Sequence, residues 1–540
     1  MNKNEISYLE AWNYINQVNL KKSFDNNYTF PVKNDRAEIE IESYFKNISQ
    51  YQSININKLD ALSKTYLENL GFSLTYLDLN LSSIIRQSKL SKEKNNKSFS
   101  KQNRRSYSRV LEATKFQVSM AEEGYITAIC PKTGKHVSSN KSIFFSEGYL
   151  FYRFVSSEVF YLITGDVWLE KAAFYFPSSD LIITLFPKKV DLIQNINKLK
   201  SFIVSNWDRV LKYTLCKDNP QTVVLVKSRH FAHHLWNELS GIYKLYESNC
   251  LTKIDKFLVV NEPLGFICDI FPEIPPDKIE NLTRKEVSYK ILENNYFVIS
   301  LGHNFIKEKL ASRVYKSAQK RCPKSFLMEI KESRKKNFPF FWVSIRTGSR
   351  TWISQVDGVV KIIKNLLNEF PELAVVIDGF SLPGTDKKKV NLQWQEIISR
   401  EQKIVQEITS LLPSTVKVYN TVGCPLYESI VWAHNIDFYL THHGTIQHKV
   451  GWTANKPGVV HTNTTILKLP LLSKPGTWER ENGIVPVFVP ERYVVDIDDK
   501  VRLRGRVIEK PSQASNYECD WRGVYKEVLK IAKSIENPNI

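Results

Sequence analysis

The sequence lacks paired cysteines and long apolar runs. Its seven cysteines, at positions 130, 216, 250, 268, 322, 424 and 519, are scattered, and none forms a CxxC pair. An odd, unpatterned set argues against a disulfide framework or an all-cysteine zinc site and indicates a reducing compartment. No run approaches the ~18 apolar residues of a membrane-spanning helix. The start, Met-Asn-Lys-Asn-Glu-Ile, lacks the apolar core of a signal peptide. We therefore expect a cytoplasmic protein.

Several familiar motifs are also missing. The sequence contains no P-loop, no GxSxG nucleophile elbow and no GxGxxG fingerprint, which disfavours kinases, α/β-hydrolases and dinucleotide dehydrogenases. Asp496-Ile-Asp498 has the letters of a DxD motif, but it lies in a charged segment after the predicted sheet. No RRM, KH, zinc-finger or helix-turn-helix signature is present, so no sequence-specific nucleic-acid partner is expected.

What the chain does have is a globular composition with a basic surplus. It has 540 residues, 42% of them hydrophobic and 12% aromatic, which excludes disorder of the whole chain and suggests three to four structural units. Lys and Arg number 75 against 56 acidic residues, a net charge of +19. The segment 86–115 holds ten Lys/Arg against two Glu, and a second basic cluster lies at 500–506. These stretches are either solvated surface or a contact for an anionic membrane face.

The organisation changes along the chain. Tyr8, Trp12, Ile15 and Val18 recur at helical spacing, so residues 1–85 are expected to be a helical N-terminal region. Residues 86–116 are expected to be a basic linker or loop. Residues 117–187 contain short β-rich runs and form a small insertion within a first lobe, 117–325. A second lobe is expected over 338–470, with a C-terminal extension, 471–540, that packs back on the lobes.

Strands and helices alternate from about residue 190. The predicted strands are 222–226, 256–260 and 296–300 in the first lobe, and 340–345, 373–377, 416–419, 438–441 and 458–461 in the second. The predicted helices are 190–213, 232–249, 305–320, 355–370, 392–412, 425–434 and 445–455, and 322–339 is expected to cross between the lobes. This alternation predicts two doubly wound, Rossmann-like lobes of the α/β class.

Two strand ends of the second lobe carry groups suited to a ligand. In open parallel sheets, ligands bind beyond the carboxyl ends of the strands. Arg346 and Arg350, with Gly348 between them, follow the first strand of this lobe and suit a phosphate, because a guanidinium donates bidentately. Their alternative is a surface turn. Asp378 ends the next strand and either binds a sugar hydroxyl or forms an Asp-Gly turn.

The strongest signal follows the fourth strand of this lobe. It reads His442, His443, Gly444, Thr445, Ile446, Gln447 and His448. If a helix begins at Gly444–Thr445, its free backbone N–H groups and dipole favour a diphosphate. No Asp or Cys completes a metal-ligand spacing, so neither a metal nor another cofactor is expected.

A second histidine group lies in the first lobe. His230, His233, His234 and Glu238 follow the strand 222–226 at a helix start. A neutral His beside a carboxylate is a suitable general base near neutral pH. The alternative is a capped helix with a packed His234.

Together these motifs resemble GT-B glycosyltransferases, and more narrowly glycosyltransferase family 61 and related bacterial polysaccharide-biosynthesis transferases. The resembling segments are His230-Phe-Ala-His-His-Leu-Trp-Asn-Glu238, Ile345-Arg346, and His443-Gly444 through His461, within about 220–465. The residues after His-Gly, Thr-Ile-Gln-His, depart from the small residues usual in that family.

This resemblance implies metal-independent transfer of a sugar from a nucleotide-sugar donor to an acceptor hydroxyl, in the synthesis of capsule, O-antigen or another glycoconjugate. The acceptor would be a glycan, a lipid-linked glycan or a protein, and the basic segments would allow peripheral contact with the inner membrane face. Two alternatives remain open: a nucleotide-sugar epimerase of the same fold, and a non-catalytic protein that binds sugars or nucleic acid.

Overall fold

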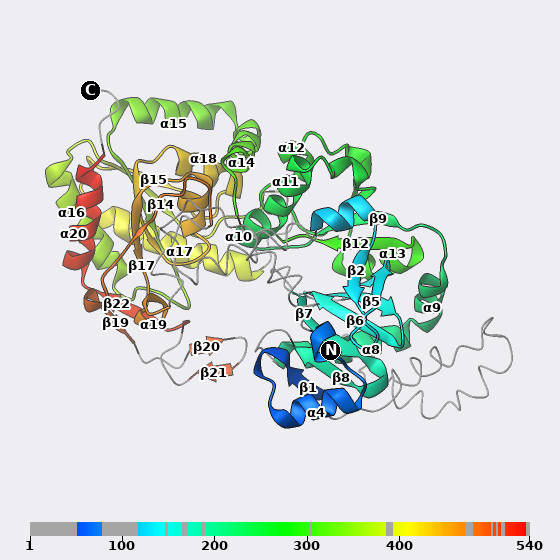
Figure 1. The fold of residues 1–540 in the computed structure, drawn as a ribbon. Helices are drawn as coiled ribbons and strands as arrows, with labels where there is room; N and C mark the ends of the chain where they lie inside the picture. Colours follow the sequence, from blue (N-terminus) through cyan, green and yellow to red (C-terminus); the bar gives the residue numbers. More distant parts are fainter. Residues whose placement is uncertain are drawn as a thin grey trace, which may run out of the picture. The chain divides into compact units, whose positions relative to one another are not determined.

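The chain forms two compact units (Figure 1). The computed structural model describes residues 51–77, 117–145, 149–164, 171–184, 190–302, 305–384, 392–469, 479–497, 501–503, 506–508 and 513–535. Unit 1 comprises residues 1–227, 241–260 and 275–304, and unit 2 comprises 228–240, 261–274 and 305–540. Residues 228–240, 261–274 and 305–325, which were assigned to the first lobe from the sequence, therefore group with unit 2. The helix predicted around Tyr8–Val18 and the basic linker lie outside the described residues.

Unit 1 contains a mixed sheet of six strands in the order β1-β8-β7-β6-β5-β4. Only the β1–β8 pair is parallel. The strands are β1 (Gln52–Asn55), β4 (Ser142–Ile143), β5 (Leu150–Val155), β6 (Val159–Thr164), β7 (Lys171–Phe176) and β8 (Leu181–Thr184), with a separate hairpin of β2 (Ile126–Ile129) and β3 (His136–Ser139). The accompanying helices are η1 (Ile56–Lys58), α4 (Ala61–Asn69), η2 (Pro177–Ser179), α8 (Val190–Ser205) and α9 (Trp207–Leu215).

A second sheet of unit 1 is entirely parallel, in the order β11-β10-β9-β12. Its strands are β9 (Gln221–Val226), β10 (Lys256–Val259), β11 (Ile279–Asn281) and β12 (Tyr296–Ser300). Helix α13 (Arg284–Glu293) precedes β12, and a capping box between Thr283 and Glu286 fixes its start. The strand β11 and helix α13 were not predicted, because β11 has only three residues and α13 has a weakly patterned apolar face.

Unit 2 is built on a six-stranded parallel sheet in the order β15-β14-β13-β16-β17-β18. Numbered along the chain, this is the 3-2-1-4-5-6 order of the Rossmann fold. Its strands are β13 (Phe340–Ser344), β14 (Ala374–Asp378), β15 (Lys417–Asn420), β16 (Phe438–His442), β17 (Gly458–His461) and β18 (Val487–Phe488). Each of the two units thus has a parallel sheet with alternating helices, which confirms the predicted α/β fold class.

The helices of unit 2 lie around this sheet (Figure 1), except for α12, which packs against α14. They are α12 (Ile267–Ile270), α14 (Glu308–Arg321), α15 (Lys324–Lys336), α16 (Gln355–Glu369), α17 (Leu392–Leu411), α18 (Leu426–His434), α19 (Thr464–Leu467), η7 (Glu491–Tyr493) and α20 (Trp521–Lys533). The strands are almost wholly apolar, as expected for a sheet covered on both faces. The C-terminal helix α20 packs against α16 and against β16 and β17, so its apolar residues belong to the same core.

Two predicted helices take a different form. The segment 232–249 begins as a short turn, α10 (Phe231–His233), continues as a π-helix, η3 (His234–Leu239), and only then becomes α11 (Ser240–Glu247). The predicted helix 445–455 begins at Gln447, after a turn, and continues as a second π-helix, η6 (Lys449–Thr453). Single π-helical turns are rare and occur frequently at functional sites. The first π-helix contains His234 and Glu238, and the second directly follows the histidine loop 442–448.

Other differences concern the edges of the units. The segment 322–339, which was expected to cross between the lobes, lies within unit 2 and contains the helix α15. The C-terminal region adds the short pairs β19 (Val494–Asp496) with β22 (Tyr517–Cys519) and β20 (Val501–Leu503) with β21 (Arg506–Ile508). In the part of the chain that the structure describes, no helix has both the length and the apolarity to cross a bilayer.

Candidate anion-binding site

The site lies where the strand order of unit 2 reverses, between β13 and β16. From β13 the chain moves outward to β14 and β15, and it then returns to place β16 on the other side of β13. Such a reversal leaves a crevice at the carboxyl ends of the two strands. Ser344 at the end of β13 and His442 at the end of β16 are joined there, with 3.0 Å between Ser344 Oγ and His442 Nδ1. The loops that carry the predicted site residues therefore begin side by side.

The loop after β13 holds two arginines in a fixed conformation. Gln355 at the start of α16 receives a hydrogen bond from the backbone N–H of Arg346 and donates one to its carbonyl (3.1 and 2.8 Å). Arg346 Nε donates to the carbonyl of Ser349 (2.6 Å). Gly348 and Arg350 both have positive φ, +92° and +58°. Burial, then the neighbouring Arg350, lowers the pKa of Arg346 to about 10, and burial also lowers the pKa of Arg350.

A distant segment, residues 514–517, fixes the same loop. The backbone N–H of Arg350 donates to the carbonyl of Ala514 (3.1 Å), and that of Thr351 donates to Asn516 Oδ1 (3.0 Å). The Tyr517 hydroxyl lies 2.8 Å from His461 Nδ1 at the end of β17. Sequence reasoning missed Gln355, which stands at the start of the next helix, and Asn516 and Tyr517, which lie 165 and 56 residues after the residues they contact, because nothing in their local pattern links them to these strand ends.

Gly444 is the point where the two guanidinium groups converge. A Cβ built on Gly444 would lie 3.5 Å from Arg346 Nη1 and 3.8 Å from Arg350 Nη1. Gly444 has φ = +139°, a conformation that L side chains rarely adopt. The space in front of its missing side chain is thus lined by two positive groups, which is an arrangement for a phosphate.

The histidines that flank Gly444 present unpaired ring atoms. Among the described residues, His442 Nε2, His443 Nδ1, His448 Nδ1 and Gln447 Oε1 are buried without a hydrogen-bond partner. Burial, Arg350 and Arg346 lower the pKa of His443 to about 4. Burial and the charges of Arg346, His461, Arg350 and His443 lower the pKa of His442 well below its usual range. Unpaired buried polar atoms are costly, so such a cluster is a strong indication of a ligand position.

The predicted helix starts two residues after Thr445, at Gln447. Thr445 and Ile446 form a turn in which the carbonyl of Thr445 accepts a hydrogen bond from the backbone N–H of His448 (3.1 Å). The π-helix η6 begins only at Lys449 and spans five residues. A helix dipole therefore contributes little here, and side chains supply the positive charge.

Asp378 lies beneath the site rather than facing it. Its carboxylate is fully buried and accepts from Lys449 Nζ (2.8 Å), Thr421 Oγ1 (2.7 Å) and Ser429 Oγ (3.0 Å). Lys449 also donates to Ser381 Oγ (2.8 Å). Because both carboxylate oxygens of Asp378 accept from protein donors, its place in the structure is that of an anchor between β14 and η6.

The segment 228–240 contains two parallel histidine pairs. His233 Nδ1 lies 3.0 Å from Asn237 Oδ1, and His234 Nδ1 lies 2.8 Å from Glu238 Oε2. His234 and Glu238 are buried, and Glu238 Oε1 also accepts the backbone N–H of Ser228 (2.9 Å). His233 is half-buried and His230 is exposed. Of the four predicted catalytic residues, His230 and His233 are thus accessible, while His234 and Glu238 form an internal pair.

Stacked aromatic rings join this segment to the histidines around Gly444. Trp236 of η3 and Trp452 of η6 have ring centroids 5.2 Å apart, and Trp452 stacks on His448 at 3.4 Å. Glu479 accepts from Trp452 Nε1 (2.9 Å), and Arg480 binds the carbonyls of Trp452 and Thr453. His233 is one of the groups whose charge lowers the pKa of His448, after burial and His443. The two histidine motifs, about 200 residues apart in the sequence, therefore lie close together within unit 2.

Two further observations delimit the site. Within the described residues, no group of three or more His, Cys, Asp or Glu side chains is arranged to hold a metal ion.

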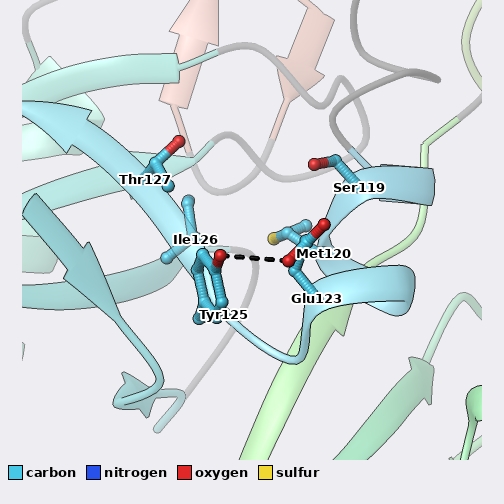
Figure 2. A pocket seen from close by; sticks show the side chains of 6 residues that line it. All are labelled: Ser119, Met120, Glu123, Tyr125, Ile126 and Thr127. Carbon is cyan, nitrogen blue, oxygen red and sulfur yellow. Dashed lines mark hydrogen bonds between the residues drawn. The ribbon is translucent and has the colours of Figure 1, made fainter. Parts of the chain in front are cut away.

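A hollow of about 210 Å³ exists in unit 1, lined by Ser119, Met120, Glu123, Tyr125, Ile126 and Thr127 (Figure 2). Tyr125 donates to Glu123 across it (3.0 Å), and none of the predicted site residues lines it.

Comparisons with known proteins give a distant likeness only. No protein-family model and no curated protein matches the chain. Among solved structures, the chain is similar to MnaA of S. aureus with UDP (12% identity, 52% of this chain and 64% of that one, TM-score 0.20). It is also similar to UDP-GlcNAc 2-epimerases from Methanocaldococcus jannaschii (14%, 48% and 66%, 0.22) and from Neisseria meningitidis bound to UDP-GlcNAc (12%, 51% and 65%, 0.22). The chain thus spans less than two thirds of each of these proteins. At such TM-scores the likeness carries no argument about activity, and the resemblance to family 61 stays a prediction.

Proposed function

We propose that the protein is a nucleotide-sugar-dependent glycosyltransferase and that unit 2 binds the diphosphate of the donor. The convergence of Arg346 and Arg350 on Gly444, at the reversal of the strand order, carries this proposal. Two guanidinium groups and the unpaired ring nitrogens of His442 and His443 match the oxygens of a diphosphate. As the sugar departs, negative charge grows on the diphosphate, and fixed positive groups stabilise it. This arrangement would bind the donor without a metal ion.

His233 is the best placed of the predicted catalytic residues to deprotonate an acceptor hydroxyl. The amide oxygen of Asn237 can only accept, so the proton of the neutral ring lies on Nδ1. The lone pair then lies on Nε2, which makes no hydrogen bond within the described residues. His233 also lies near His448 and so near the proposed diphosphate. His234, by contrast, is fully buried and paired with Glu238, so its ring is less accessible to an acceptor than that of His233.

The acceptor and the biological setting follow from the sequence rather than from the site. A glycan, a lipid-linked glycan or a protein is the proposed acceptor, in a bacterial polysaccharide or glycoconjugate pathway. The net charge of +19 would favour an acceptor held at an anionic inner membrane face. An epimerase of the same fold would use the same donor site but no acceptor. A non-catalytic binding protein would use neither a nucleotide-sugar donor nor an acceptor.

A thermal-shift screen against UDP, GDP, CMP and dTDP, with and without a divalent cation, tests this proposal. A ligand that binds only the native state stabilises it by ~2.7 kcal/mol at a hundredfold excess over Kd. We expect one nucleotide to raise the melting temperature, and a divalent cation to leave that shift unchanged. The corresponding nucleotide sugar then separates the activities: conversion without an acceptor indicates an epimerase, and acceptor-dependent release of the nucleotide indicates a transferase. If no nucleotide shifts the melting temperature, the proposal fails.

A further inference from the structure

The histidines around Gly444 have a property that the proposed function does not itself require. His442 Nε2, His443 Nδ1 and His448 Nδ1 are buried ring atoms that find no partner among the described residues. The other nitrogen of His442 is already engaged by Ser344 Oγ (3.0 Å), and the ring of His448 is fixed by its stack on Trp452. The rings of His442 and His448 are therefore fixed in orientation, and each of the three histidines has a buried nitrogen that is unpaired among the described residues and suits a ligand.

Two arginines and two further histidines surround these rings. Arg346 and Arg350, the two cations, come from the loop after β13. His461, whose pKa burial lowers to about 3, lies at the end of β17, and His233 lies in the segment 228–240. Tyr517 faces the two arginines from the C-terminal segment, and its own pKa is raised well above the usual range, by burial first, so it adds no negative charge near neutral pH. The carboxylate of Glu401 faces Arg346, and that of Asp378 is paired with Lys449. Burial and these cations keep the histidines neutral in the free protein, with the pKa of His443 lowered to about 4.

A bound diphosphate would reverse that balance. It would bring two negative charges against Arg346 and Arg350 and so cancel the repulsion that disfavours an imidazolium. It would also offer oxygen acceptors to ring nitrogens, which donate a hydrogen bond only when they carry a proton. We propose that binding of a nucleoside-diphosphate group at this site is coupled to proton uptake by the cluster His442, His443 and His448, with His443 as the principal acceptor of the proton. This inference rests on the proposed function, because it presumes that the diphosphate binds there.

The sign of the linkage follows directly. A group whose pKa rises on ligand binding makes the affinity greatest at low pH and weaker as the pH rises through the window between its free and bound pKa values. For His443 that window opens at about pH 4. Uptake of one proton weakens Kd by up to tenfold per pH unit, so we expect a loss of roughly three- to tenfold per unit between about pH 5 and 7.

Isothermal titration calorimetry of the full chain tests the coupling. UDP-glucose, UDP-GlcNAc, GDP-mannose and dTDP-glucose are suitable probes, because their phosphates are diesters and lack the second phosphate ionisation near pH 6 that complicates UDP itself. Binding enthalpies measured at one pH in two buffers of different ionisation enthalpy give the number of protons taken up. We expect a net uptake of about 0.5–1 proton near pH 6.

Two matched variants show which histidine takes up the proton. His443→Asn should weaken binding and remove most of the uptake and of the pH dependence. His136→Asn, the same change on an exposed histidine of β3 in unit 1, should alter neither. Binding by the wild-type chain with no proton uptake and a pH-independent Kd would overturn the coupling, since neutral tautomers would then be donating. Unchanged uptake in a folded His443→Asn variant would overturn the assignment to His443. Absence of binding by every probe would instead refute the proposed function.

Discussion

The ammonium group of Lys449 lies 2.8 Å from Oδ2 and 3.0 Å from Oδ1 of Asp378, and both side chains are buried. This ion pair ties the end of β14 to η6, the π-helix that directly follows the histidine loop. The loop can hold Gly444 against the two arginines because its far end is anchored in this way.

Breaking this pair should destabilise the protein strongly. Asp378→Asn keeps the shape of the side chain but leaves the charge of Lys449 buried and unpaired, and such a loss typically costs ~3–5 kcal/mol. The exposed pair Lys361–Asp357 provides the control, because its nitrogen–oxygen distance of 2.7 Å is close to the 2.8 Å of the buried pair. Asp357→Asn should change the free energy of unfolding by less than about 0.5 kcal/mol. If Asp378→Asn were as stable as this control yet bound no nucleotide, Asp378 would be a ligand residue rather than an anchor.

Substitution of Arg346 or of Gly444, which border the anion site, should weaken nucleotide binding. Arg346→Ala deletes a charged hydrogen-bond donor, which is worth ~1.5–3 kcal/mol, so Kd should rise roughly ten- to hundredfold. Gly444→Ala should act in the same direction, because φ = +139° strains any L side chain and the Cβ would occupy the ligand space. Arg492→Ala removes the same charge from a side chain that rests on Tyr493 and serves as the control. Equal binding by Arg346→Ala and Arg492→Ala, measured by calorimetry, would place the diphosphate elsewhere.

Substitutions in the two adjacent histidine pairs should have different effects, one on the rate of catalysis and the other on thermal stability. His233→Gln should lower the rate of sugar transfer by ~10²–10⁴-fold, the usual contribution of a general base, while Kd for the nucleotide stays within about twofold. Glu238→Gln should instead lower the melting temperature, because Glu238 holds both His234 and the backbone of Ser228. Measurements of kcat and of thermal unfolding on both variants distinguish these roles. A His233→Gln enzyme with wild-type kcat would refute His233 as the base.

The stability of unit 2 should fall in acid because it buries neutral histidines. Burial, then Lys456 and Arg480, lowers the pKa of His434 to about 3, and its ring stacks on Tyr315 at 3.8 Å. The unfolded chain protonates this group near its ordinary value of ~6.5, so its stabilising contribution is complete above that pH and declines below it by up to ~1.4 kcal/mol per pH unit. Glu479, whose pKa burial raises to about 7, acts in the opposite direction over part of this range.

A variant isolates the His434 contribution from these opposing groups. His434→Phe retains a ring for Tyr315 but cannot titrate, so its free energy of unfolding should decline less steeply between about pH 6.5 and 4.5, by ~1.4 kcal/mol per unit relative to wild type. Urea unfolding at several pH values measures this difference. His136→Phe, an exposed site in unit 1, should show the wild-type slope. A His434→Phe slope equal to that of wild type would mean that His434 is already protonated in the native state.

The fold class was readable from the sequence because parallel strands buried on both faces are short, apolar and regularly spaced. The strands Phe340–Ser344 and Phe438–His442 are such runs. Their predicted ends placed the arginine loop and the histidine loop at the carboxyl edge of the sheet, where the structure has them. The helix expected from Thr445 begins at Gln447 and continues as a π-helix, since local periodicity does not distinguish an α-helix from a π-helix that Glu479 and Arg480 hold in place from another part of the chain.

The amino-acid sequence supplies the chemical groups of the candidate site: Arg346 and Arg350 at one strand end, His442 to His448 at another, and the pairs at His230 to Glu238. Which of these groups meet depends on the packing of the folded chain. The 3-2-1-4-5-6 strand order sets β16 beside β13, buries Asp378 under Lys449, and lets Trp236 and Trp452 join segments about 200 residues apart. Those contacts depend on long-range packing of many apolar residues, whose partners no local pattern specifies.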